Sequence, residues 1–205
     1  MSDVWSTIHA ERQSLADEVS NLTPEQWQTP TMAVWTVHEV LAHLTSAAKM
    51  TPPKFVVKMA AAGFNFDNFA AKEVAREGAG GPDATLAEFR AVSGRTSAPP
   101  GPKDTWLGEA VVHGEDIRRA LGISHKYAPE DVARALTFYS NSNAIIGGKR
   151  RVEGLTMKAT DTDFSLGDGP VVEGPIMSLV LAATGRKAAL DELSGPGLET
   201  LRSRS

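Results

Sequence analysis

A glutamate and a histidine stand four residues apart in the segment Trp106-Leu-Gly-Glu-Ala-Val-Val-His113, at positions 109 and 113. In a helix, this spacing places two side chains one above the other on the same face. A carboxylate oxygen and an imidazole nitrogen presented together are two arms of a divalent-metal chelate, and another imidazole would complete a site with open coordination positions. His43 is the best candidate for that third arm. The sequence therefore predicts a metal site formed by His43, Glu109 and His113.

A glutamate and a histidine at this spacing also occur as an ordinary hydrogen-bonded or solvated pair on a helix surface. The neighbouring residues argue against that alternative, because Trp106, Ile117 and Ala120 share the same side of the helix and make it mainly apolar. A buried carboxylate without a partner is costly, and a cation suits a carboxylate that lies beside a neutral imidazole.

Two helices must position these ligands. His43 lies in Trp35-Thr-Val-His-Glu-Val-Leu-Ala-His-Leu44, where Thr36 and Glu39 have the spacing of a capping box. This pattern predicts a helix from about residue 36 to 51, stopped by Pro52-Pro53. The second helix follows the proline-rich connector 98–103 and carries Glu109 and His113.

The remaining pattern predicts a mostly α, α+β chain. Helices are expected over 3–20, over 53–77 with a break at Gly63, from a cap at Thr85 to about Arg95, from Pro129 to about Ile146, over 174–184, and after Gly197 to Arg204. After Gly148, the segments 152–160 and 163–166 read as strands. We therefore expect a helical metal-binding domain over residues 1–147 and a small α+β domain over residues 148–205.

Composition limits the classes of function. The chain has 205 residues, 41% of them hydrophobic, which suffices for a real core. Its formal charge of −4 and its few short basic pairs argue against a nucleic-acid partner. No apolar run approaches the roughly 20 residues that span a bilayer, and the N-terminus lacks the pattern of a secretory signal. We therefore expect a soluble, cytoplasmic protein without a membrane partner.

The chain contains no cysteine. Disulfides, cysteine-ligated zinc and an enzyme thiol as nucleophile are therefore excluded. A metal with an open position can bind a small-molecule thiol as readily as water and hold it as the thiolate at neutral pH.

The chain resembles the mycothiol-dependent maleylpyruvate isomerase-like proteins of the DinB/YfiT-like metal-binding superfamily, over nearly its whole length. The resemblance rests on 35–44 and 109–118 in the N-terminal part, and in the tail on Ala159-Thr-Asp-Thr-Asp163, Gly167-Asp-Gly169-Pro, Val172-Glu-Gly174-Pro, Ala183-Thr-Gly185-Arg186 and Leu193-Ser-Gly195-Pro-Gly197. It implies a DinB-like four-helix bundle followed by a small α+β domain. It also implies a metal, usually zinc, on His43, Glu109 and His113.

The same resemblance implies thiol chemistry. By this resemblance, the protein is expected to be an S-transferase or isomerase that uses a mycothiol-like thiol as co-substrate and an electrophilic small molecule as substrate. Many DinB relatives use three histidines, so a glutamate at 109 places this chain nearer the mycothiol-dependent branch.

Three further residues are candidates for the site. Arg76 and Arg186 carry guanidinium groups that could grip the anionic end of a thiol or an acidic substrate. For Arg186, a charge at the C-terminal end of a helix is the structural alternative. Asp116, three residues after His113, could accept a hydrogen bond from an imidazole and orient it. The alternative for Asp116 is a surface pair with Arg118 or Arg119.

Three classes of function remain open from the residues alone: a metal-dependent S-transferase or isomerase that uses a small thiol, a metal-dependent hydrolase with metal-activated water, and a non-catalytic metal-binding or regulatory protein. A hydrolase needs a nearby general base, for which Glu39, Glu115 and Asp116 are available.

Overall fold

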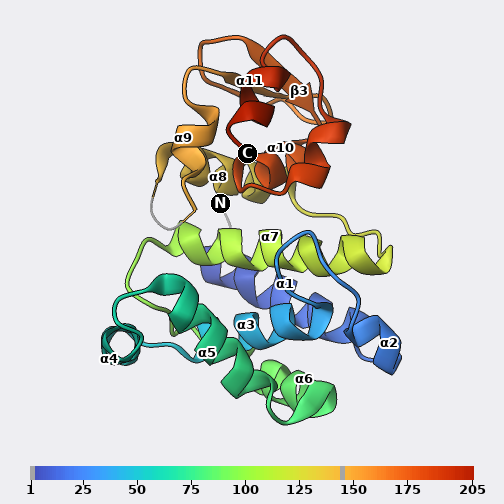
Figure 1. Ribbon diagram of the computed structural model, residues 1–205. Coiled ribbons are helices and arrows are strands. Elements are labelled where there is room, and N and C mark those ends of the chain that lie inside the picture. Colours follow the sequence, from blue (N-terminus) through green and yellow to red (C-terminus); the bar gives the residue numbers. More distant parts are fainter. Residues whose placement is uncertain (1–2, 144–145) are drawn as a thin grey trace. The chain divides into compact units, whose positions relative to one another are not determined.

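The computed structural model describes residues 3–143 and 146–205, and it is mostly helical with one small sheet (Figure 1). The chain divides into two compact units, Met1–His125 and Lys126–Ser205. Mostly helical α+β architecture is what the sequence predicts, and the structure confirms it.

The elements of the first unit are all helices over its described residues, apart from an isolated β-bridge between Pro30 and Thr36. Its elements are α1 (Val4–Glu18), α2 (Pro24–Trp27), α3 (Val37–Lys49), α4 (Pro52–Ala61), α5 (Phe66–Gly78), α6 (Gly81–Val92) and α7 (Lys103–Leu121). Helix α3 packs against α5, α6 and α7, and α1 packs against α7 and α6. Apolar side chains from α1, α3, α6 and α7 form one buried cluster that includes Leu15, Leu41, Phe89 and Ile117. These four helices therefore share the core of the unit.

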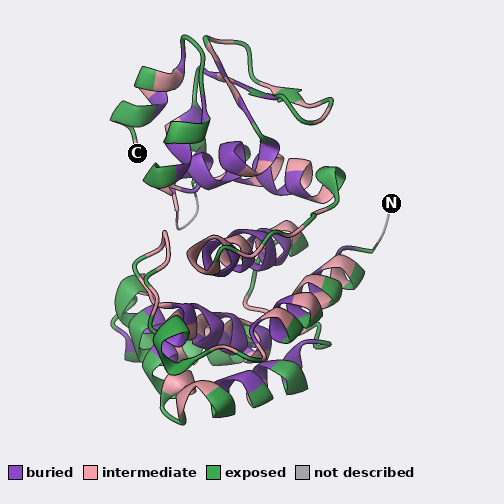
Figure 2. Cartoon of the chain, turned by 90° about the vertical axis from the view of Figure 1, so that its right-hand side faces the viewer, coloured by how far each residue is buried: buried purple, intermediate pink, exposed green. Residues whose placement is uncertain are grey.

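Helix α1 buries one side along its length. Val4, Ile8, Arg12, Leu15 and Ala16 are its buried residues, at the spacing of successive helical turns. Figure 2 shows buried and exposed residues alternating along this helix, which follows the N-terminus. One member of the buried side, Arg12, is charged.

Helix α3 begins at the predicted capping box. The Thr36 hydroxyl accepts from the Glu39 backbone N–H, and the Glu39 carboxylate accepts from the Thr36 backbone N–H at 2.8 Å. Two N-terminal amide groups without intrahelical partners are satisfied in this way, which fixes where the helix starts. Helix α2 has the same arrangement, with Thr23 and Gln26.

Two details of the first unit differ from the sequence prediction or sharpen it. The break expected at Gly63 separates α4 from α5, because Gly63 and Phe64 both have positive φ and cannot continue a right-handed helix. Thr85 was expected to cap a helix, but α6 starts four residues earlier, at Gly81. The Thr85 hydroxyl instead donates to the Gly81 carbonyl one turn back.

Helix α7 is the longest element, with 19 residues. It ends at Gly122, whose φ of 67° is left-handed, and the Ile123 N–H donates to the Arg118 carbonyl at 2.8 Å. A glycine in this conformation closes a helix without the steric cost that a side chain would bring.

The second unit combines helices with a three-stranded sheet. Its elements are α8 (Pro129–Asn141), α9 (Gly148–Val152), β1 (Thr156–Ala159), β2 (Ser165–Leu166), β3 (Val171–Gly174), α10 (Ile176–Ala183), the 3₁₀ helix η1 (Lys187–Glu192) and α11 (Leu198–Ser203). The strand order is β2-β1-β3, with β1 antiparallel to β2 and parallel to β3. The two segments predicted as strands contain β1 and β2, whereas β3 and the short α9 were not predicted.

A glycine permits the close approach that the connection after β2 requires. Gly167 has φ of +104°, and a Cβ there would lie 2.0 Å from the Leu155 carbonyl oxygen. No other residue type fits this position without moving the backbone.

The boundary between the two units lies before α8. The sequence prediction placed it after residue 147 and so assigned α8 to the helical domain. Helix α8 packs instead against α10 and α9 within the second unit. Its predicted end near Ile146 is also too late, since the helix stops at Asn141; residues 144 and 145 lie outside the described residues.

Among the described residues, no helix is both long enough and apolar enough to cross a membrane.

Candidate metal site

The structure brings together the three predicted metal ligands. His43 lies on α3, and Glu109 and His113 lie one turn apart on α7, which packs against α3. Each of the three residues offers a ligand atom, and these atoms all lie within 4.8 Å of one another. His43 Nε2 donates to Glu109 Oε2 at 3.1 Å. Two imidazole nitrogens and a carboxylate oxygen at this separation can converge on one divalent ion.

The three side chains are partly buried. The exposed fractions of the His43 and His113 side chains are both 14%, and that of Glu109 is 23%. Burial alone would raise the pKa of the Glu109 carboxyl, but the nearby His43, His113 and Arg12 outweigh this effect and lower the pKa to about 2. Glu109 is therefore an anion at neutral pH, as a metal ligand must be.

Asp116 holds one of the histidine ligands. Its fully buried carboxylate accepts a hydrogen bond from His113 Nδ1 at 3.0 Å. A proton on Nδ1 leaves Nε2 of the neutral imidazole with the lone pair that a metal needs. The Asp116 side chain has no exposed surface, so it is not on the solvated face of the helix. Arg119 Nε donates to Glu115 Oε1, and Arg118 Nε donates to Glu18 Oε2.

The Trp35 ring packs beside both histidine ligands. Its ring centroid lies 4.8 Å from that of His43, with 34° between the planes, and 6.2 Å from that of His113. The tryptophan stands directly before the capping box of α3, so the start of this helix places both Trp35 and His43. A tryptophan directly before a helix start is visible in the sequence. That position alone did not identify Trp35 as part of a site.

A buried cation on α1 was also missed. Arg12 has an exposed fraction of 5%, and its Nη1 donates to the Arg95 carbonyl at 3.2 Å. Burial lowers the pKa of Arg12 to about 10, while the charge of Glu109 acts in the opposite direction. The guanidinium therefore stays positive at neutral pH. The sequence signal was a charged residue on the apolar side of a predicted helix, between Ile8 and Leu15.

The two other predicted arginines form hydrogen bonds with groups outside the triad. Arg76, on α5, donates from Nη1 to Glu73 Oε1 at 2.7 Å and from Nη2 to Glu77 Oε1 at 2.8 Å, so carboxylates of its own helix hold its guanidinium. Arg186 belongs to the second unit and donates from Nη1 to the Thr184 carbonyl just after α10. That bond matches the helix-end alternative considered for Arg186.

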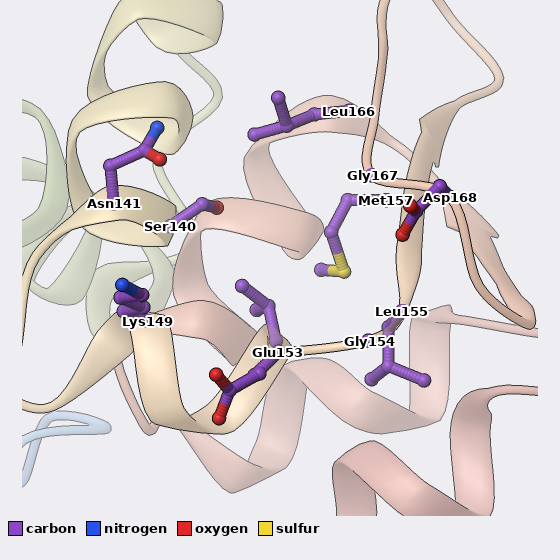
Figure 3. A pocket seen from close by; sticks show the side chains of 11 residues that line it. Ser140, Asn141, Lys149, Glu153, Gly154, Leu155, Met157, Leu166, Gly167 and Asp168 are labelled. Atoms are coloured by element: carbon purple, nitrogen blue, oxygen red, sulfur yellow. The ribbon is translucent and has the colours of Figure 1, made fainter.

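The second unit has a pocket of its own, with a volume of about 180 Å³. Figure 3 shows Ser140 and Asn141 of α8, Lys149 of α9 and Glu153 on its sides, with Met157 of β1 reaching toward the space between them. None of the candidate metal ligands lines this pocket.

Comparisons with known proteins give one sequence family and two similar folds. A sequence family described as "Mycothiol maleylpyruvate isomerase N-terminal domain" matches residues 8–108. The matched range includes His43 and ends one residue before Glu109. No curated protein matches the chain.

Two solved structures are similar over the whole fold. One is a crystal structure of the mycothiol-dependent maleylpyruvate isomerase, with 15% sequence identity, and the other is a histidine-to-alanine mutant of the mycothiol-dependent maleylpyruvate isomerase, with 16% identity. In both comparisons the TM-score is 0.63, and the match covers 94% of this chain and 91% of the other. At this identity the likeness concerns the fold. The family match over residues 8–108, just under half of the chain, and the two similar folds agree with the family that the sequence resembles.

Proposed function

We propose that this protein is a metal-dependent enzyme of small-thiol chemistry, an isomerase or S-transferase with mycothiol or a similar thiol as co-substrate. The observation that carries the proposal is the convergence of His43, Glu109 and His113, whose ligand atoms lie within 4.8 Å of one another. The family match and the two similar folds support the choice of thiol chemistry over other uses of a metal site.

The residues fit a divalent metal, and zinc is the ion we propose. Two imidazoles and one carboxylate are the ligand set of an open zinc site, which keeps a position for a further ligand. Glu109 is ionised, and Asp116 fixes the proton of His113 on Nδ1. When bound, the metal supplies Lewis acidity and keeps a bound thiol in the thiolate form at neutral pH.

The protein's own residues cannot supply the sulfur nucleophile, because the chain has no cysteine. The thiol must therefore be a co-substrate, and the electrophile a second small molecule. We place this reaction in the cytoplasm, where low-molecular-weight thiols are kept reduced.

A hydrolase would need a general base beside the metal. The three carboxylates considered for this role have other partners: Glu39 accepts from the Thr36 backbone, Glu115 from Arg119, and Asp116 from His113. These bonds favour thiol chemistry over water activation.

The first experiment measures bound metal by elemental analysis in the purified protein and in His43→Ala, Glu109→Ala and His113→Ala. The wild-type protein is expected to bind one equivalent of zinc, and each variant less. His38→Ala is the matched control, since His38 is on the same helix but binds the Thr85 hydroxyl at 2.9 Å. A Glu109→Ala/His113→Ala variant that keeps a full equivalent would place the metal elsewhere.

The second experiment separates the functions. Cobalt-loaded protein is titrated with mycothiol, and turnover of maleylpyruvate is followed with and without the thiol. A thiol enzyme gives a sulfur-to-cobalt charge-transfer band and activity that depends on thiol. Ester or amide hydrolysis without thiol, with a spectrum that ignores mycothiol, would favour the hydrolase; metal binding without any turnover would favour a regulatory protein.

A further inference from the structure

Arg12 is a buried cation whose presence the fold alone does not explain. Its exposed fraction is 5%, and its Nε has no hydrogen-bond partner among the described residues. Within the part of the chain that the structure describes, the side chain forms one hydrogen bond, from Nη1 to the Arg95 carbonyl. A buried charge with so few partners is costly unless an opposite charge compensates it.

The compensating charge is Glu109. Arg12 lies on the buried side of α1, and α1 packs against α7, which carries Glu109. The Glu109 carboxylate acts to raise the pKa of Arg12, and the Arg12 guanidinium acts to lower the pKa of Glu109. Arg12 therefore belongs to the electrostatic surroundings of the candidate metal site, although it is not one of the ligands.

A fixed positive charge next to a divalent cation has two opposite effects. It repels the metal, and so weakens metal binding. It also attracts any anion that occupies the open coordination position, because the local medium screens charges less than water does. The second effect is useful only if the species bound at the metal is an anion.

We propose that Arg12 is a positioning residue for an anionic ligand at the metal: its buried guanidinium weakens metal binding and strengthens binding of a thiolate in the open position. This inference rests on the proposed function, because it takes the triad as a metal site and a thiolate as its further ligand.

A purely structural role for Arg12 leads to the opposite expectation. If the guanidinium only attaches α1 to the segment after α6 through the Arg95 carbonyl, its removal loosens the bundle and weakens metal binding. The direction of the change in metal affinity therefore distinguishes the two roles.

The test compares Arg12→Gln, which keeps a hydrogen-bond donor without the charge, with Arg12→Lys, which keeps the charge. Cobalt affinity is measured by competition with a chromophoric chelator, and thiol affinity by the charge-transfer band on titration with 2-mercaptoethanol. We expect Arg12→Gln to bind cobalt about tenfold more tightly and the thiol about tenfold more weakly than wild type, with Arg12→Lys close to wild type.

Arg90→Gln is the matched control. Arg90 Nη2 also donates to a backbone carbonyl, that of Ala16 on α1, but the side chain is 44% exposed and lies 3.9 Å from the Asp17 carboxylate. This variant should leave both affinities unchanged. If Arg12→Gln does not fold, Arg12→Met fills the same volume without charge or donor and takes its place in the comparison with Arg12→Lys.

The outcomes separate the two proposals. A wild-type protein that binds no cobalt, or whose cobalt spectrum ignores the thiol, refutes the proposed function. In the other case, the wild-type protein binds cobalt and responds to the thiol, while the folded uncharged variant binds cobalt no more tightly than Arg12→Lys does. That result refutes only the role assigned to Arg12.

Discussion

At the scale of single residues, the site depends on groups that hold the ligands as much as on the ligands themselves. Asp116 is fully buried and accepts a hydrogen bond from His113 Nδ1. This bond selects the tautomer whose other nitrogen can bind a metal, and it fixes the plane of the ring. Trp35 restricts the other histidine by packing against its ring.

Asp116→Asn tests this role. An amide can accept the same hydrogen bond only through its oxygen and carries no negative charge, so we expect metal affinity to fall about 10- to 100-fold. Competition with a chelator measures the change. Glu115→Gln is the control, because Glu115 precedes Asp116 and pairs with Arg119 instead of a ligand. Equal affinities in the two variants would show that the bond to His113 has no effect on the metal.

At the scale of elements, the start of α3 decides where Trp35 and His43 lie. The reciprocal bonds of Thr36 and Glu39 satisfy backbone groups at the first turn. Helix α7 places Glu109 and His113 one turn apart, and its contact with α1 contains a second charged cluster. There Arg118, with no exposed side-chain surface, donates from Nε to Glu18 Oε2 at 2.6 Å and from Nη1 to Glu11 Oε2 at 3.2 Å.

Thr36→Ala should lower the free energy of unfolding by about 1 kcal/mol, because the first turn of α3 loses its side-chain acceptor. Urea denaturation of the metal-free protein measures the loss. Thr23→Ala removes the same kind of cap from α2, which has only four residues, and should cost less. A larger loss for Thr23→Ala would contradict the importance assigned to the start of α3.

The ion pair between α1 and α7 predicts a pH dependence. Burial raises the pKa of Glu18, but the hydrogen bond and the charge of Arg118 outweigh it, so the pKa is lowered on folding. A lowered pKa gives stability that is present above the unfolded value near 4.5 and is lost as the pH falls through the folded value. The melting temperature of the wild-type protein should therefore fall more between pH 6 and pH 3 than the melting temperature of Glu18→Gln. Parallel losses in the two proteins would be the contrary result.

At the scale of the whole molecule, all three candidate ligands lie in the first of two compact units. A ligand that binds only the folded state stabilises the part that binds it, by about 2.7 kcal/mol when its free concentration is 100 times the dissociation constant. Metal binding should therefore be coupled to the unfolding of the helical unit.

Calorimetry with zinc and with a chelator tests this coupling. Zinc should raise the melting temperature of the transition that belongs to the first unit, and the chelator should reverse the change. His113→Ala should show neither effect. A melting curve that is unchanged after verified metal removal would mean that the site is too weak to be coupled to the bundle.

The sequence by itself determined the local features. Helical spacing of Glu109 and His113, the capping box of Thr36 and Glu39, and the proline and glycine stops depend on residues within one or two turns of one another, so short-range rules predict them. The absence of cysteine likewise determined that a nucleophilic thiol must come from outside the chain. The choice of His43 as the third ligand also came from its place in a recognisable helix pattern.

Only the tertiary structure decided which distant groups meet. Arg12 reaches the surroundings of Glu109 because α1 packs against α7, and no local pattern records that contact. The Arg76 guanidinium donates to Glu73 and Glu77. The sequence alone does not distinguish an arginine with these partners from one that binds a ligand. Helix α8 belongs to the second unit because its apolar side packs against α10, whereas its own pattern is that of any amphipathic helix. Periodicity shows that a helix has a side to bury, but the packing partner depends on the whole chain.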